Sequence, residues 1–168
     1  MSARKLAILV GGGPAPGING VIGAATIEAV NNGLSVIGIY EGFKWISSDK
    51  FVPERHMVEL RISDVGRIHF DGGSILRTAR TTLLDESPVE DSSVVKPDDK
   101  KVRAVLRNFT DLGVTHVMTI GGDDTLLSAR FVAEKTNGRI RVVHVPKTID
   151  NDLPLPGEEP TFGFLTRL

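Results

Sequence analysis

The sequence predicts an α/β fold with a doubly wound, mostly parallel sheet and helices on both of its faces. Two observations predict this fold. Short unbroken apolar runs, typical of strands buried on both faces, alternate along the chain with segments of helical periodicity. Glycine-rich or acidic loops follow three of these runs, and in such sheets ligands bind beyond the carboxyl ends of the strands.

The first half of the chain reads as a strand, a helix and a second strand. Residues 6–10 form an apolar run that ends in three glycines, and residues 19–32 carry apolar side chains at helical spacing. Gly33 stands where a helix usually ends, and residues 35–40 form the second strand. This order predicts a βαβ unit.

The second half repeats the alternation. We expect a helix at residues 98–112, a strand at 114–120, a helix at 125–136 and a strand at 140–145. Residues 41–97, between the halves, read as an irregular region with a Gly72-Gly73 turn, and residues 85–99 read as an exposed loop. No linker or repeat divides the chain, so we expect one Rossmann-like, three-layer domain.

Composition narrows the function classes. The 168 residues carry 20 Lys and Arg against 21 Asp and Glu, and a net charge of −1 offers no electrostatic case for nucleic-acid or membrane binding. The absence of Cys excludes disulfides, thiolate zinc sites and cysteine nucleophiles. No apolar stretch reaches the roughly 18 residues of a membrane span, and no signal peptide is evident, so we expect a cytoplasmic protein.

The first loop, residues 11–17, reads Gly-Gly-Gly-Pro-Ala-Pro-Gly and precedes a helix. Glycines such as Gly12 and Gly13 let backbone N–H groups approach an anion, which the helix dipole also favours. The loop is not a Walker A loop, because no Gly-Lys-Ser/Thr follows, and Pro16 occupies the last glycine position of a dinucleotide fingerprint. A tight turn without a ligand explains it equally well.

The second loop, Gly121-Gly122-Asp123-Asp124-Thr125, also lies between a strand and a helix. In one interpretation, Asp and Thr only cap the helix. In the other, one carboxylate holds Mg²⁺ while glycine amides face phosphate oxygens, because Mg²⁺ usually takes one or two carboxylates plus substrate phosphates. Two adjacent acids exceed what capping requires.

The third loop is Pro146-Lys147-Thr148-Ile149-Asp150-Asn151-Asp152. One carboxylate can accept a proton from an attacking hydroxyl, a second can fix a metal, and Lys147 can neutralise phosphate. Asx-turns that only stabilise the loop are the alternative. Any one loop could be structural, but three such strand ends in one sheet favour a functional site.

Weaker candidates lie elsewhere. Arg77 and Arg80 follow the Gly72-Gly73 turn and suit the clamping of phosphoryl oxygens, although a solvated surface position explains Arg77 better. The four histidines lack ligand spacing, so no histidine metal site is expected. His144 lies inside an apolar strand and reads as a buried, hydrogen-bonded residue.

Together these segments resemble the phosphofructokinase family. The matching pieces are residues 11–19 (family pattern G-G-x-x-P-G-x-N), 72–80, 121–125 and 148–152 (T-I-D-N-D), in the family's order and over nearly the whole chain. The resemblance implies that Asp150 is the general base for the 1-hydroxyl of fructose 6-phosphate. It also implies that Asp123 and Asp152 organise Mg²⁺ and the transferred phosphoryl group, and that Thr148 contacts the sugar phosphate. Arg80 and Lys147 would act in phosphoryl transfer. The residues that would contact the phosphoryl donor are Gly12, Gly13, Gly122, Asp124 and Thr125.

Two departures from the family bear on the donor. Members that use ATP typically have Gly at the positions of Asp124 and Lys147. A carboxylate at Asp124 would repel the α-phosphate of ATP, while Lys147 suits a compact, highly charged donor. The pair, with Pro14 in place of the usual Asp, resembles the pyrophosphate-dependent branch. Arg77 stands where a Gly is common, and the sequence does not explain this difference.

The resemblance therefore implies reversible phosphoryl transfer from pyrophosphate to fructose 6-phosphate, as in glycolysis. An ATP-dependent enzyme, or a donor-binding module inactive on its own, remains an alternative. From the resemblance we expect residues 1–168 to correspond to the N-terminal donor-binding and catalytic domain, with the second, sugar-phosphate domain absent from this chain. Residues 162–168 read as a helix beginning, as expected for a piece of a longer protein, and we expect the full-length protein to be a homo-oligomer.

Overall fold

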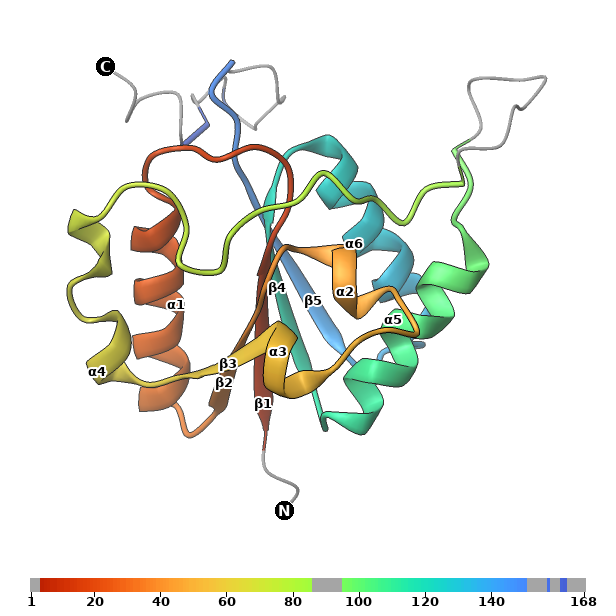
Figure 1. The fold of residues 1–168 in the computed structure, drawn as a ribbon, viewed down its shortest axis with the longest axis horizontal. Coiled ribbons are helices and arrows are strands. Elements are labelled where there is room, and N and C mark those ends of the chain that lie inside the picture. Colours follow the sequence, from red (N-terminus) through yellow and green to blue (C-terminus); the bar gives the residue numbers. More distant parts are fainter. Residues whose placement is uncertain (1–3, 86–94, 151–156, 158–160, 163–168) are drawn as a thin grey trace.

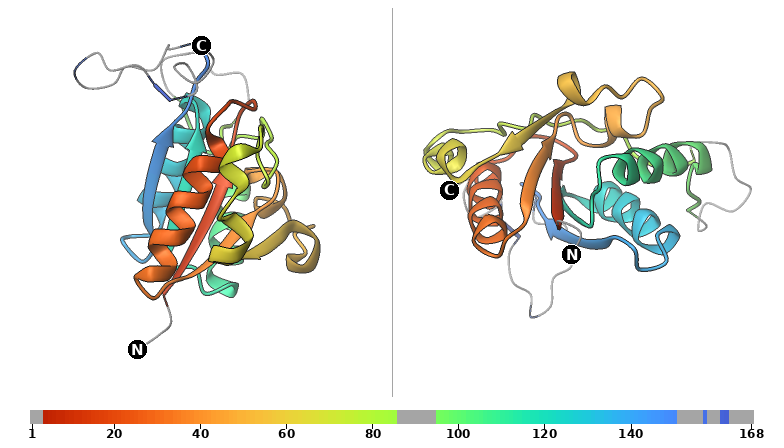
Figure 2. Two further views of the ribbon diagram at one scale, coloured as in Figure 1. Left: turned by 90° about the vertical axis from the view of Figure 1, so that its left-hand side faces the viewer. Right: turned by 90° about the horizontal axis from the view of Figure 1, so that it is seen from below.

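The computed structural model describes residues 4–85, 95–150, 157 and 161–162. They form three layers, with one sheet in the middle and helices on both of its faces (Figures 1 and 2). The sheet has five strands in the order β3-β2-β1-β4-β5. In chain order they are β1 (Lys5–Val10), β2 (Ser35–Ile39), β3 (Met57–Leu60), β4 (His116–Gly121) and β5 (Arg141–Pro146). Strand β1 pairs in parallel with β2 and β4, and β4 pairs in parallel with β5. The mostly parallel α/β fold is thus confirmed.

Three long helices cover the two faces of the sheet. They are α1 (Ile18–Asn31), α5 (Asp99–Asp111) and α6 (Asp123–Lys135), close to the predicted ranges. Helix α1 lies on one face, and α5 and α6 lie on the other (Figure 2). Helix α6 begins two residues earlier than predicted, so both acids of the second loop lie in its first turn.

The segment expected to be irregular contains short elements, and the prediction was wrong there. It holds α2 (Phe43–Ile46), α3 (Pro53–His56), strand β3, α4 (Ile62–Val65) and the 3₁₀ turn η1 (Ile68–Phe70). Strand β3 is an edge strand that pairs antiparallel with β2. Elements of three or four residues are too short to show a periodicity, which explains why the sequence pattern missed them.

Strand β1 separates two hydrophobic clusters. Ala7 and Leu9 face the cluster under α5 and α6, while Ile8 and Val10 face the cluster under α1 and α4. All four side chains are fully buried. Because both faces of this strand are covered, its sequence is an unbroken apolar run rather than an alternation.

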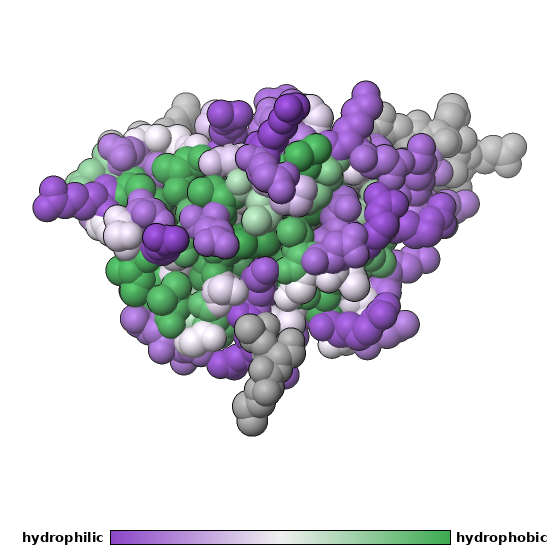
Figure 3. All heavy atoms as spheres, turned by 60° about the horizontal axis from the view of Figure 1, so that its bottom comes forward, coloured by the Kyte–Doolittle hydropathy of each residue, from purple (hydrophilic) through white to green (hydrophobic). Residues whose placement is uncertain are grey.

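The surface differs between the two sides of the molecule. When the molecule is turned so that the bottom of the Figure 1 view comes forward, apolar side chains gather on the left-hand side, where α1, α4 and β3 lie (Figure 3). The right-hand side, which carries α5, is mostly hydrophilic. Within the described ranges, no helix is long and apolar enough to cross a membrane.

The order of the strands creates a crevice at one end of the sheet. The chain leaves β1 through α1 toward β2, whereas it leaves β4 through α6 in the opposite direction, toward β5. The loops after the neighbouring strands β1 and β4 therefore diverge at their carboxyl ends, which is where doubly wound sheets bind ligands.

Candidate active site

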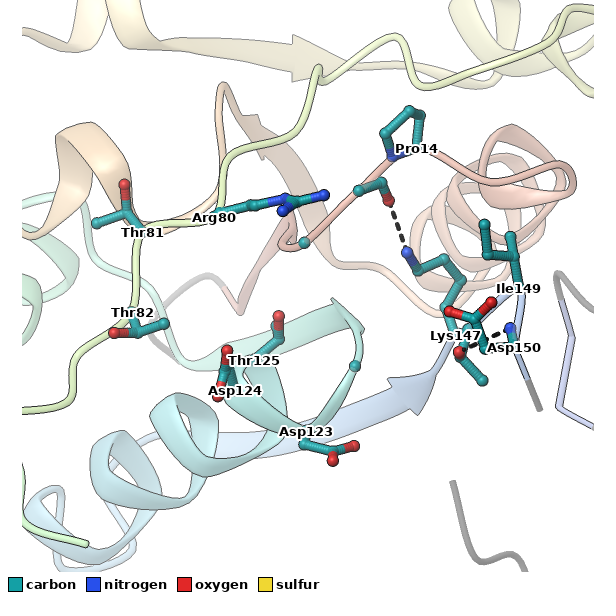
Figure 4. Close-up of a pocket in the computed structure, with 14 residues that line it drawn as sticks. Pro14, Arg80, Thr81, Thr82, Asp123, Asp124, Thr125, Lys147, Ile149 and Asp150 are labelled. Carbon is teal, nitrogen blue, oxygen red and sulfur yellow. Dashed lines mark hydrogen bonds between the residues drawn. The ribbon is translucent and has the colours of Figure 1, made fainter. Parts of the chain in front are cut away.

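A pocket of about 480 Å³ occupies this crevice (Figure 4). It is lined by the first loop, the start of α6, residues 80–82 and the segment after β5, so the structure brings the three predicted loops together. The predicted site residues that line it are Gly12, Gly13, Arg80, Gly122, Asp123, Asp124, Thr125, Lys147, Thr148 and Asp150. Asp152 lies outside the described residues, and its role stays a prediction.

The first loop is tied to its neighbours through backbone hydrogen bonds. Gly11 N–H donates to the Ile120 carbonyl at 2.9 Å, and Gly12 N–H donates to the Ala79 carbonyl at 2.9 Å. The Gly12 amide is thus already committed, and what this residue offers a ligand is the absence of a side chain, at a φ of 80°. The N–H of Gly13 has no hydrogen-bond partner among the described residues and can donate to an anion.

The second loop does not use its acids as caps. Gly122 is the N-cap of α6 and no side chain accepts a hydrogen bond there. Asp123 and Asp124 are exposed, and their side chains diverge from the first turn of the helix (Figure 4). The capping interpretation therefore fails, and the N–H groups of Asp123 and Asp124, the first two of α6, have no hydrogen-bond partner among the described residues.

Thr125 holds the ends of β1 and β4 together. Its side chain is buried, and it packs so closely against Gly11 and Gly121 that a Cβ atom at either glycine would collide with it. These two glycines are needed because helix α6 begins directly against the strand ends. Thr125 thus shapes the floor of the pocket.

Lys147 is the central cation of the site. It is 6% exposed, and its Nζ donates to the Gly13 carbonyl at 2.6 Å, while Arg80 enters the pocket from the other side (Figure 4). Burial lowers the pKa of Lys147, the nearby Arg80 lowers it further, and Asp150 opposes both effects. None of the ion pairs among the described residues includes Lys147. A buried cation without a carboxylate partner is costly, and a bound anion would relieve that cost.

Asp150 sits at the pocket rim on a turn fixed by its neighbours. Its N–H donates to the Thr148 hydroxyl at 3.1 Å, and Lys147 N–H donates to the Gly121 carbonyl at 2.8 Å. The Asp150 side chain is exposed and not engaged in these bonds. Its carboxylate is therefore free to accept a proton from a bound hydroxyl.

The residues present fit Mg²⁺ only together with a phosphate ligand. The described part of the chain contains no group of three or more His, Asp or Glu side chains placed to hold a metal. Asp123 and Asp150 both line the pocket, and Mg²⁺ commonly binds one or two carboxylates, with water and substrate phosphates completing its shell.

Four lining residues were not among the predicted site residues: Pro14, which the sequence marked only as a departure from the family, and Thr81, Thr82 and Ile149. The threonines directly follow Arg80, and two hydroxyls beside a candidate phosphate-binding Arg were an available signal.

Two residues outside the pocket are now explained. Arg77 has a φ of 58°, a left-handed backbone that glycine adopts most easily, and its guanidinium lies 5.4 Å from the Tyr40 ring centre. His144 is only half-buried, although it is hydrogen-bonded as predicted: its Nδ1 pairs with the Thr119 hydroxyl at 2.8 Å, whereas its buried Nε2 has no hydrogen-bond partner within the described ranges. Neither side chain lines the pocket.

The fold and this pocket define an α/β domain whose sheet carries a pocket lined by Lys147 and Arg80 at its switch point. A family model for phosphofructokinase matches residues 5–168. Over 165 residues the chain is 54% identical to the pyrophosphate–fructose 6-phosphate 1-phosphotransferase of Thermotoga maritima, which covers 98% of this chain and 36% of that protein. A protein of the same name from Naegleria fowleri is 50% identical over 161 residues, covering 96% and 33%. The chain belongs to the phosphofructokinase family.

A solved structure agrees on the fold. The crystal structure of Pichia pastoris phosphofructokinase in the T-state superposes with a TM-score of 0.74 at 24% identity, and covers 98% of this chain and 17% of that one. The chain spans about a third of the length of the two curated relatives.

Proposed function

We propose that this chain is the donor-binding and catalytic part of a pyrophosphate-dependent phosphofructokinase. The reaction would transfer a phosphoryl group from pyrophosphate to the 1-hydroxyl of fructose 6-phosphate, giving fructose 1,6-bisphosphate and phosphate. The observation that carries the proposal is the buried Lys147, which faces a compact pocket opposite Arg80 and, among the described residues, donates from its Nζ to a backbone carbonyl rather than to a carboxylate. The names of the two relatives support the same donor.

The choice of donor depends on Asp124 as well as Lys147. Asp124 lies in the first turn of α6 and lines the pocket. Pyrophosphate is compact and carries its charge close to the reacting centre, where Lys147 and Arg80 would neutralise it. The further phosphate of ATP would have to pass the Asp124 carboxylate, and like charges at close range in a partly desolvated pocket are strongly unfavourable.

Asp150 acts as the general base in this mechanism. The 1-hydroxyl oxygen attacks one phosphorus of pyrophosphate and its proton goes to the Asp150 carboxylate. The bond from that phosphorus to the bridging oxygen breaks, and phosphate leaves. Lys147 and Arg80 neutralise the charge on the phosphoryl oxygens, because phosphoryl transfer depends mainly on positioning and charge stabilisation.

Magnesium and the sugar complete the proposed site. Asp123 and Asp152 would hold Mg²⁺, which supplies positive charge beside the phosphoryl group when bound. Thr148 would contact the sugar phosphate, and a second domain would supply the rest of that site. We propose that the full-length protein is a homo-oligomer.

Phosphoryl transfer with each donor tests the proposal. The purified chain, and a longer version that includes the second domain, are assayed with fructose 6-phosphate and either pyrophosphate or ATP, both with Mg²⁺. We expect turnover with pyrophosphate in the longer version. Turnover with ATP and none with pyrophosphate would contradict the assigned donor.

A double substitution tests the account of donor choice. Asp124→Gly combined with Lys147→Gly removes the repulsive carboxylate and the additional cation, so ATP use should rise at least tenfold while pyrophosphate use falls. Lys50→Gly, at an exposed position away from the pocket, is the control and should change neither. Unchanged ATP use in the double variant would argue against the charge-based account.

A further inference from the structure

Asn19, near the start of α1, is a buried polar side chain that the proposed function does not use. It is 2% exposed, yet its amide makes two hydrogen bonds to a distant segment. The Nδ2 group donates to the Asp71 carbonyl at 3.1 Å, 52 residues away in the sequence. The Oδ1 atom accepts from Ile75 N–H at 2.9 Å, 56 residues away.

Only a side-chain amide of this length can make both bonds at once. The Asp71 carbonyl requires a donor and the Ile75 N–H requires an acceptor, and the Asn amide presents one of each from a single plane. An Asp would keep the acceptor and lose the donor, and a Leu of similar volume would lose both. The amide of Asn19 therefore links Asp71 and Ile75, which flank the Gly72-Gly73 turn.

The segment held by Asn19 leads directly to the pocket. After Ile75, Leu76 accepts a hydrogen bond from Glu41 N–H, and Ala79 accepts one from Gly12 N–H, each at 2.9 Å. Gly11 and Ala79 also form a parallel bridge. Arg80 is the next residue, so its position follows from how this segment is anchored.

We infer that Asn19 is a positioning residue for Arg80. Its amide sets the start of the segment, the bond from Gly12 sets the end, and together they direct the Arg80 side chain into the pocket opposite Lys147. The ligand in this inference rests on the proposed function, whereas the anchoring itself does not.

Hydrogen exchange tests the anchoring without any ligand. In Asn19→Leu we expect protection of the N–H groups of both Ile75 and Gly12 to fall at least tenfold, because loss of the clamp loosens the whole segment. Asn108→Leu is the matched control. Asn108 also donates to a backbone carbonyl, that of Ile46 at 2.9 Å, but lies in α5. It should leave Ile75 and Gly12 protected.

A double-mutant cycle tests the effect on Arg80. Asn19→Leu should weaken binding of Mg²⁺-pyrophosphate about tenfold, but should have no further effect in a chain that already carries Arg80→Ala. If Asn19→Leu does not fold, Asn19→Asp takes its place in both experiments. It keeps the acceptor, so we expect a smaller loss of hydrogen-exchange protection at Ile75.

Two results would overturn the inference. One is unchanged Gly12 protection although Ile75 loses protection, which would make Asn19 a support for the turn alone. The other is an equal loss of affinity with and without Arg80. If the unsubstituted chain does not bind pyrophosphate, the proposed function fails, and the exchange at Gly12 still decides whether Asn19 anchors the segment.

Discussion

At the scale of single residues, the site depends on a cation in a buried position, where an unpaired charge is unfavourable. Lys147 is almost fully buried, and its ammonium group donates a hydrogen bond to the Gly13 carbonyl. Burial lowers the pKa of this lysine, and Arg80 adds to the effect. An anion in the pocket would compensate both cations at once, so we expect the pocket to favour small, highly charged ligands.

The lowered pKa of Lys147 predicts a pH dependence. Only the protonated amine attracts an anion, so pyrophosphate affinity should fall as the pH rises through that lowered pKa, below the range where an ordinary lysine titrates. Calorimetric titration at a series of alkaline pH values measures this. Lys147→Arg, which stays charged, should lose this fall. The same fall in Lys147→Met would assign it to another group.

Arg77 predicts an effect on stability alone. An L-residue in the left-handed region is strained by roughly 1–2 kcal/mol, so Arg77→Gly should be more stable than Arg77→Ala by about 1 kcal/mol. Both variants lose the contact with the Tyr40 ring, so the comparison isolates the backbone. Urea unfolding measures it, and equal stability of the two variants would count against the strain.

At the scale of elements, the sequence could predict those with long patterns. Strand β1 is buried on both faces and reads as an apolar run, and the buried residues of the amphipathic helix α5 recur at helical spacing. The ends of both elements were therefore predicted to within about two residues. Strand β3 was missed because four residues on a sheet edge show no alternation. The start of α6 was misplaced because a glycine N-cap followed by two acids looks like an acidic cap.

Strand β1 also predicts where stability is concentrated. Ile8 is fully buried between the sheet and α1, so Ile8→Ala should lower the free energy of unfolding by about 2–5 kcal/mol. Ile62→Ala is the control, because this side chain in α4 is 39% exposed, and it should cost less than about 1 kcal/mol. Chemical denaturation compares them, and similar losses would contradict the assigned core.

At the scale of the whole molecule, the site is built from loops far apart in sequence. That the three loops meet could be predicted, because the carboxyl ends of parallel strands share one edge of the sheet. The bonds of Gly12 to Ala79 and of Asn19 to Asp71 and Ile75 could not, because no local pattern records a partner more than fifty residues away. Sequence therefore predicted which residues line the pocket better than how they are anchored.

The chain spans about a third of the length of its two curated relatives. Every described residue of the proposed donor site lies in one pocket of this chain. Donor binding should therefore survive in the isolated chain, whereas the proposed sugar site requires a second domain.

Calorimetric titration of this chain with pyrophosphate, ATP and fructose 6-phosphate, each with Mg²⁺, decides whether the pocket selects pyrophosphate through Lys147. We expect that pyrophosphate binds, that ATP binds at least tenfold more weakly, and that fructose 6-phosphate alone gives no measurable heat of binding. We also expect Lys147→Met to abolish pyrophosphate binding and Lys50→Met to leave it unchanged. ATP binding as tight as that of pyrophosphate, or pyrophosphate binding that does not depend on Lys147, would rule out the proposed donor site.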